Sequence, residues 1–137
     1  MKNLFLDTNV VIDYLANRQP FAADAGKLFQ LALDGKVKIY ISALSYNNIH
    51  YVLRQTLSNT ATIKVLEEIA EMSEIADVSK LIIRKALKSE FKDFEDAIQY
   101  YCALNLNKID CIVTRNSKDF KKSNLALMTP SEAIAHY

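Results

Sequence analysis

Short apolar runs alternate along the chain with longer stretches in which apolar residues recur every three or four positions. The short runs have the length of buried strands, and the longer stretches have the spacing of one helix face. The expected strands are residues 4–6, 37–41, 111–114 and 125–128, with a weaker fifth at 76–78. The expected helices are residues 22–34, 43–57, 61–72, 79–88 and 94–104. This alternation predicts an α/β fold in which helices cover both faces of a mainly parallel sheet of four or five strands.

The composition is typical of one folded domain. The chain has 137 residues, of which 50% are hydrophobic and 24% charged. With only two glycines and two prolines, it shows no linker or repeat, so we expect a single domain over residues 1–137. No apolar run approaches the roughly 18–20 residues that span a membrane, and Asp7 comes too early for a signal peptide. We therefore expect a cytoplasmic protein that does not bind membranes.

The charge and the cysteine content argue against a protein that binds nucleic acid through an overall basic charge and against a zinc-site protein. The net charge of +1 provides no overall basic field, so any nucleic acid must be held by local patches or through a bound metal. Two cysteines and two distant histidines are too few for the usual zinc sites. We expect Cys102 and Cys111 to be reduced core residues.

Polar side chains gather where the expected strands end. In a parallel sheet, ligands bind outside the carboxyl ends of the strands. Carboxylates that converge there repel one another, and a divalent cation with a preference for hard oxygen ligands, Mg²⁺ or Mn²⁺, removes that repulsion. The side chains that follow strands are Asp7, Thr8, Thr114, Asn116 and Asp119, and Asp93 and Asp96 open the helix just before the strand at 111–114.

Each acidic residue also has a purely structural interpretation. Asp7 is suited to cap a helix that starts at residue 9 or 10, and Asp93 is the natural N-cap of the helix at 94–104. Asp96 then lies in the first turn of that helix, where negative charge is favourable. Asn116 and Asp119 are similarly placed to cap a short helix at 117–121. The spacing of three between Asp93 and Asp96 nevertheless puts both carboxylates within reach of one cation.

Four segments, taken in order, resemble the motifs of the PIN-domain family. They are LDTNVVID at 6–13, SALSYNNI at 42–49, DFEDAIQ at 93–99 and IVTRNSKDF at 112–120, and MTPSEA at 128–133 resembles the usual ending. The resemblance covers nearly the whole chain. It implies a three-layer α/β/α sandwich and Mg²⁺- or Mn²⁺-dependent cleavage of RNA. Many bacterial members of this size are VapC-like toxins, which implies a small antitoxin protein as partner and a homodimer.

The resemblance also implies roles for individual residues. Asp7 and Asp96 match the two most dependable metal-site carboxylates, and Asp93 matches an additional acidic position. Two positions depart from the family pattern, because Asn48 and Asn116 stand where acidic residues are usual. Asp119 and Asp93 are expected to offset the missing charge.

The remaining expected roles concern ligand orientation and substrate contact. Asp93, Asn116 and Asp119 are expected to take part in catalysis beside the metal ligands Asp7 and Asp96. Hydroxyl and amide groups are expected to orient ligands or water, and nearby cations to contact RNA phosphates. The first group comprises Thr8, Asn48 and Thr114, and the second Arg115, Lys118 and Lys121.

Two other functions remain open at this point. The two asparagines motivate a catalytically weak or inactive PIN-like module that binds RNA or protein without cutting. A haloacid-dehalogenase-like phosphatase also begins with a strand-end Asp, but it needs a second Asp two residues on, where this chain has Asn9.

Overall fold

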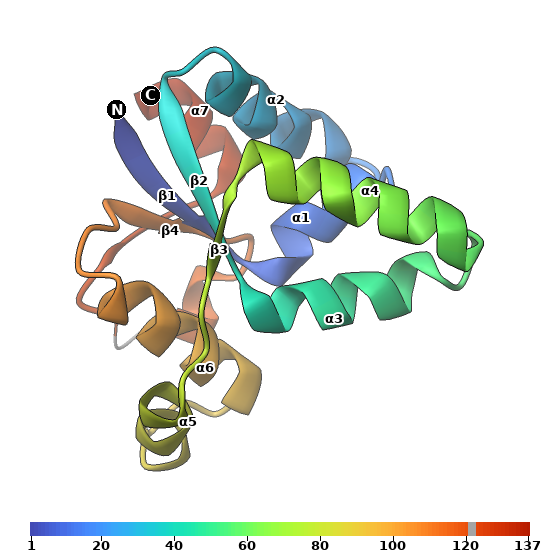
Figure 1. Cartoon of the computed structure of the whole chain (residues 1–137). Coiled ribbons are helices and arrows are strands. Elements are labelled where there is room, and N and C mark those ends of the chain that lie inside the picture. The colour runs from blue at the N-terminus through green and yellow to red at the C-terminus, as the bar shows by residue number, and fades with distance from the viewer. Residues whose placement is uncertain (121–122) are drawn as a thin grey trace.

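The computed structural model describes residues 1–120 and 123–137, and Figure 1 shows helices on both sides of one twisted sheet. The strands are β1 (Lys2–Leu6), β2 (Val37–Ser42), β3 (Glu74–Ala76), β4 (Cys111–Val113) and β5 (Ala126–Met128). Their order is β3-β2-β1-β4-β5, and every neighbouring pair is parallel. The predicted parallel sheet is confirmed, with five strands.

The five helices expected from the amphipathic pattern are present, apart from some of their ends, and a helix at 130–136 that the pattern did not predict is present as well. They are α1 (Thr8–Leu15), α2 (Ala22–Leu33), α3 (Ala43–Leu53), α4 (Asn59–Met72), α5 (Lys80–Leu87), α6 (Phe94–Asn105), the 3₁₀ helix η1 (Ser117–Phe120) and α7 (Pro130–His136). The helix expected over 43–57 is wrong beyond Leu53, because the Ser58 side chain caps α4 and the intervening residues turn. The weak strand expected at 76–78 begins two residues earlier, since it pairs with β2 in the register Tyr40↔Glu74.

Consecutive residues of the central strands enter two separate cores. In β1, Leu4 and Leu6 pack into one core while Phe5 packs into the other, and all three are fully buried. A strand buried on both faces reads as a continuous apolar run, as this one does. Helices α1 to α4 and α7 contribute to the first core, and α5 and α6 contribute to the second. The result is a three-layer α/β/α sandwich.

The strand order reverses next to β1. The chain runs outward from β1 through β2 to β3, and then crosses to β4 and β5 on the other side. In open parallel sheets such a reversal leaves a crevice at the carboxyl ends of the two strands that flank it. Here those strands are β1 and β4, so the residues that follow them, beginning with Asp7 and Thr114, are placed at the crevice.

Over the two described ranges, no helix combines the length and the apolar character needed to cross a membrane.

Candidate active site

Asp7 and Thr114 meet at the carboxyl ends of the two central strands. The Asp7 N–H extends the β1–β4 ladder by donating to the Val113 carbonyl at 3.0 Å. The Thr114 hydroxyl donates to Oδ2 of Asp7 at 2.9 Å, and Asp7 is only 6% exposed. Asp7 does occupy the N-cap position of α1, but its side chain makes no capping hydrogen bond. Capping therefore does not account for this carboxylate.

The first turn of α6 carries the other acidic residues. Asp93 caps this helix, because its Oδ1 accepts from the Asp96 N–H at 3.1 Å. The structural role expected for Asp93 is thus confirmed. Asp96 lies one turn inside the helix and is half-buried, and within residues 1–120 and 123–137 its carboxylate makes no hydrogen bond that would explain its position.

The acidic side chains are close enough to perturb one another. Burial, followed by the charges of Asp93, Asp7, Asp119 and Glu95, raises the pKa of Asp96 to about 7. Burial also raises the pKa of Asp7, although the hydrogen bond from Thr114 opposes this effect. Carboxylates with raised pKa values and like-charged neighbours are typical of functional sites. Here they indicate a site that favours either protons or a cation.

The raised pKa of Asp96 predicts that the metal-free protein loses stability as the pH rises. A group with a raised folded-state pKa makes the folded state bind more protons, so stability falls between about pH 4 and pH 7 and then levels off. Asp96→Asn removes this loss, and we expect it to stabilise the protein by about 1 kcal/mol, or about 4 °C, at pH 8 after allowance for solvent screening. Thermal melts in EDTA measure this gain. It should vanish at pH 4, and a variant that is less stable than wild type at pH 8 contradicts the prediction.

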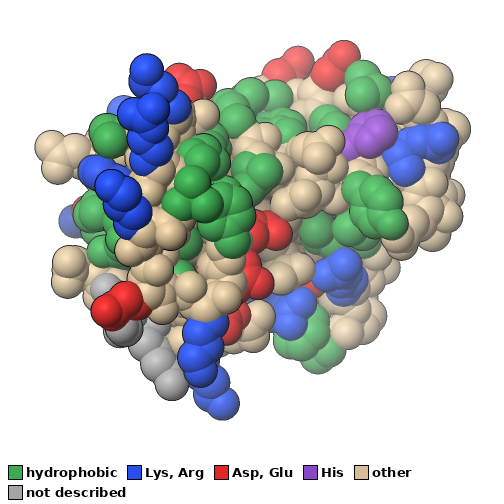
Figure 2. Space-filling view, turned by 90° about the horizontal axis from the view of Figure 1, so that it is seen from below, with side chains coloured by type: hydrophobic (Ala, Val, Ile, Leu, Met, Phe, Trp, Pro, Cys, Tyr) green, Lys and Arg blue, Asp and Glu red, His purple; other side chains and the backbone are tan. Residues whose placement is uncertain are grey.

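A pocket of about 310 Å³ opens beside these carboxylates. Asp93, Asp96 and Asp119 line it together with Lys118 and the ring of Phe91. Figure 2 views the face toward which the strands' carboxyl ends point, and acidic side chains run along a hollow in its middle with Lys and Arg side chains nearby. The pocket thus combines carboxylates with cations that suit a phosphate.

Glu95 is a site residue that the sequence analysis missed. The side-chain N–H₂ group of Asn48 on α3 donates to Oε1 of Glu95 at 3.0 Å. Asn48 thus brings a carboxylate from α6 to the place where an acidic residue at position 48 was expected. The negative charge of Glu95 contributes to the raised pKa of both Asp7 and Asp96. The signal was present in the sequence, because Glu95 precedes Asp96 directly, but only the packing of α3 near α6 shows that it reaches Asn48.

A second missed group is a buried polar network behind the carboxylates. The hydroxyls of Thr8 and Ser45 lie 2.6 Å apart, and Nε2 of Gln99 donates to both, at 2.6 and 2.9 Å. Thr8 is 5% exposed, and the other two are fully buried. Thr8 therefore holds neighbouring elements together from the inside.

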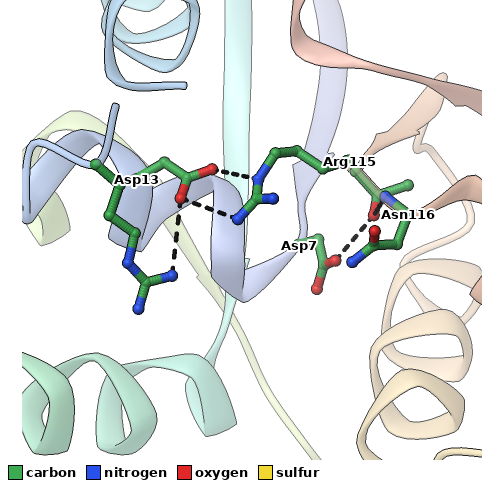
Figure 3. A network of polar contacts seen from close by, with 6 residues as sticks. Asp7, Asp13, Arg115 and Asn116 are labelled. Carbon is green, nitrogen blue, oxygen red and sulfur yellow. Dashed lines mark hydrogen bonds and ion pairs between the residues drawn. The ribbon is translucent and has the colours of Figure 1, made fainter. Parts of the chain in front are cut away.

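Two residues of the loop after β4 that were expected to belong to the site, Arg115 and Asn116, point in different directions (Figure 3). In Figure 3, the Asn116 side chain points toward Asp7, and the backbone N–H of Asn116 donates to the Thr114 hydroxyl at 3.1 Å. Arg115 points the other way, where its Nε and Nη2 donate to the Asp13 carboxylate at 2.6 and 3.2 Å and its guanidinium lies 3.8 Å from the centre of the Phe21 ring. The contacts of Arg115 are thus structural. Lys121, the other cation expected to contact RNA, lies outside the described residues.

The donor set suits a hard divalent cation that keeps part of its water. Within residues 1–120 and 123–137, no three His, Cys, Asp or Glu side chains are gathered as a preformed chelate. The interacting pair Asp7 and Asp96 offers two carboxylates, with the hydroxyl of Thr114 and the amide of Asn116 close to the first. Mg²⁺ is commonly bound through one or two carboxylates and retains several waters. The side chains present therefore fit such an ion.

Comparison with known families separates the PIN-like interpretations from the phosphatase one. A family model described as "PIN domain" matches residues 3–118. The chain belongs to the PIN-domain family. The match includes the first three of the four similar segments in full and the fourth as far as Lys118, and it leaves the phosphatase alternative without support. In this PIN domain, the acidic hollow lies where the order of the central strands reverses.

Individual relatives share the whole length of this PIN domain. It is 24% identical to Ribonuclease VapC1 of Aquifex aeolicus over 96% of this chain and 92% of the relative. Among solved structures, it resembles a chain of VapBC2 from Rickettsia felis bound to a promoter DNA fragment, with a TM-score of 0.68, 20% identity and coverage of 93% of this chain and 98% of the other. A chain of a toxin-antitoxin complex from Klebsiella pneumoniae matches with a TM-score of 0.67 and 24% identity, covering 93% and 97%. These structural matches establish the fold.

Proposed function

We propose that this PIN domain is a ribonuclease that uses Mg²⁺ or Mn²⁺ held by Asp7 and Asp96. The observation that carries the proposal is the meeting of these two carboxylates at the strand reversal, where Thr114 orients one of them, and burial followed by like charges raises the pKa of both. The similarity to Ribonuclease VapC1 over nearly the full length supports RNA as the substrate. The domain extends over residues 1–137, because β5 and α7 complete the sheet and the first core.

The site residues have distinct roles in this reaction. A divalent cation held here would supply an activated water molecule and would stabilise charge on the phosphate. Asp7 and Asp96 bind the ion, and the Thr114 hydroxyl orients Asp7. Asp93, Asp119 and the Asn116 amide lie around them and orient water or substrate. Lys118, at the pocket, contacts a phosphate of the RNA strand.

Glu95 supplies the negative charge that an acidic residue at position 48 would otherwise bring to the site. Asn48 holds Glu95 by a hydrogen bond of 3.0 Å, so Glu95 supplies negative charge near Asp7 and Asp96. Thr8, which directly follows Asp7, supports the position of that carboxylate from the buried side through its hydrogen bonds with Ser45 and Gln99. Asn48 and Thr8 thus support the carboxylates without binding the ion.

Titration with metal tests the proposed activity. A fluorescently labelled single-stranded RNA should be cleaved when Mg²⁺ or Mn²⁺ is added and should stay intact in EDTA. The asparagines at 48 and 116 favour one competing function, a module that binds RNA without cutting it. RNA binding with no cleavage at any metal concentration would support that competitor and contradict the nuclease.

The partner proposed for this nuclease is an antitoxin protein. The solved structures it resembles include a toxin-antitoxin complex and VapBC2 bound to promoter DNA. We expect expression of the chain to arrest growth, and co-expression with the product of an adjacent small gene to restore it. A homodimer is part of the same proposal, and light scattering of the purified protein measures it. Normal growth during expression of an active nuclease would contradict the toxin role and leave the chemistry standing.

A further inference from the structure

A buried amide joins the two segments that carry Asp7 and Asp96. Gln99 lies on α6 one turn after Asp96, on the same face of the helix, and is fully buried. Its Nε2 donates to the hydroxyl of Thr8 at 2.6 Å, and Thr8 directly follows Asp7. The same Nε2 donates at 2.9 Å to Ser45 on α3. The bridge therefore runs from the helix of one carboxylate to the strand end of the other.

The stability of the core does not explain an amide at position 99. Over the described residues, Oε1 of Gln99 has no hydrogen-bond partner, although buried carbonyl oxygens nearly always find one. The hydroxyls of Thr8 and Ser45 lie 2.6 Å apart, so one of them donates to the other without Gln99. An apolar side chain of similar length would fill the same space and leave no unpaired oxygen. An amide at position 99 is therefore not needed to fill the core, and what it adds is the pair of hydrogen bonds that tie α6 to Thr8 and Ser45.

We propose that Gln99 is a positioning residue that sets the separation of Asp7 and Asp96 for a divalent cation. This inference rests on the proposed metal-dependent function. Thr114 holds Asp7 from the side of β4, and the hydrogen bond from Gln99 to Thr8 holds the same strand end from the side of α6. Because Gln99 and Asp96 share one helix face, the bridge also fixes the approach of Asp96 to Asp7. Without it, the carboxylates keep their chemistry but lose their spacing.

Calorimetric titration of RNA-free protein with Mn²⁺ tests this role. We expect Gln99→Met to raise the Kd for Mn²⁺ by about 10- to 100-fold, the usual effect of removing a group that orients metal ligands. Its melting temperature in EDTA should be equal to or above that of wild type, because the variant removes an unpaired buried oxygen. Thr62→Val is the matched control, since Thr62 is an equally buried polar residue on α4 whose hydroxyl donates to the Ser58 carbonyl. That variant should lower the melting temperature and leave the Kd for Mn²⁺ unchanged.

A second variant, Gln99→Asn, keeps an amide that is too short to reach both hydroxyls, and it should also weaken Mn²⁺ binding. If both variants fold and bind Mn²⁺ within twofold of wild type, the positioning role is wrong while the metal site stands. If both fail to fold, the proposal is contradicted, because it requires the bridge to be dispensable for stability. If the wild-type protein binds no Mn²⁺, the proposed function itself is wrong.

Discussion

Asp7→Asn and Asp96→Asn are each expected to lower the rate of RNA cleavage by at least about 100-fold, and neither should be rescued by excess metal. An amide of the same shape keeps the packing of each side chain but removes the negative charge that binds the ion. Asp7 also loses a charged acceptor for the Thr114 hydroxyl. A fluorescence assay of labelled RNA at saturating Mn²⁺ measures the loss.

The control for both variants is Glu68→Gln, which makes the same chemical change at an exposed position on α4. It should cleave RNA at the wild-type rate. Because Asp96→Asn is expected to stabilise the metal-free protein at pH 8, misfolding does not account for its loss of activity. Cleavage within twofold of wild type in either Asp variant would remove that residue from the metal site.

Arg115→Met is expected to destabilise the protein by about 3 kcal/mol, the usual effect of leaving a buried charge without its partner. Asp13 is 1% exposed and is held by two hydrogen bonds from Arg115, with the Arg18 guanidinium more distant at 3.7 Å. Arg115 also packs against the Phe21 ring. Equilibrium unfolding in urea measures the loss, and the double variant Asp13→Asn/Arg115→Met should recover part of it.

This experiment also decides whether Arg115 contacts RNA, as the sequence predicted. Arg84→Met, on the exposed side of α5, is the control for losing one positive charge. If Arg115→Met keeps its stability and loses RNA affinity at low salt, Arg115 is a phosphate contact and the ion pair with Asp13 is secondary. If stability falls while the folded fraction binds RNA normally, the structural role of Arg115 is confirmed.

The fold could be predicted from local sequence patterns, because each pattern corresponds to one type of secondary structure. A buried strand needs a short apolar run, and a covering helix needs one apolar face. Both were visible in the chain, so the parallel sheet and its two covering layers could be predicted. The end of α3 at Leu53 could not, since the residues after it continue the helical spacing and only the cap at Ser58 shows where the next helix begins.

The site could be predicted only where its residues lie next to recognisable elements. Asp7 follows a strand and Asp96 lies in the first turn of a helix, and the structure brings them close enough for the charge of Asp7 to act on Asp96. Glu95 and Gln99 were missed because their importance depends on α6 packing near Asn48, Thr8 and Ser45, which lie far away in the sequence. The RNA contact of Arg115 was predicted from its charge and its place beside the fourth motif, whereas its pairing with Asp13 across about 100 positions is a tertiary contact.

A crystal soaked in Mn²⁺ and measured for anomalous scattering is the most direct test of the metal site. We predict an anomalous peak between the carboxylates of Asp7 and Asp96, coordinated at the distances usual for oxygen ligands and completed by water. The same soak of Asp7→Asn crystals should show no peak there. Wild-type crystals with no Mn²⁺ at this position, or with Mn²⁺ bound only elsewhere, would contradict a metal-dependent nuclease built on these two residues.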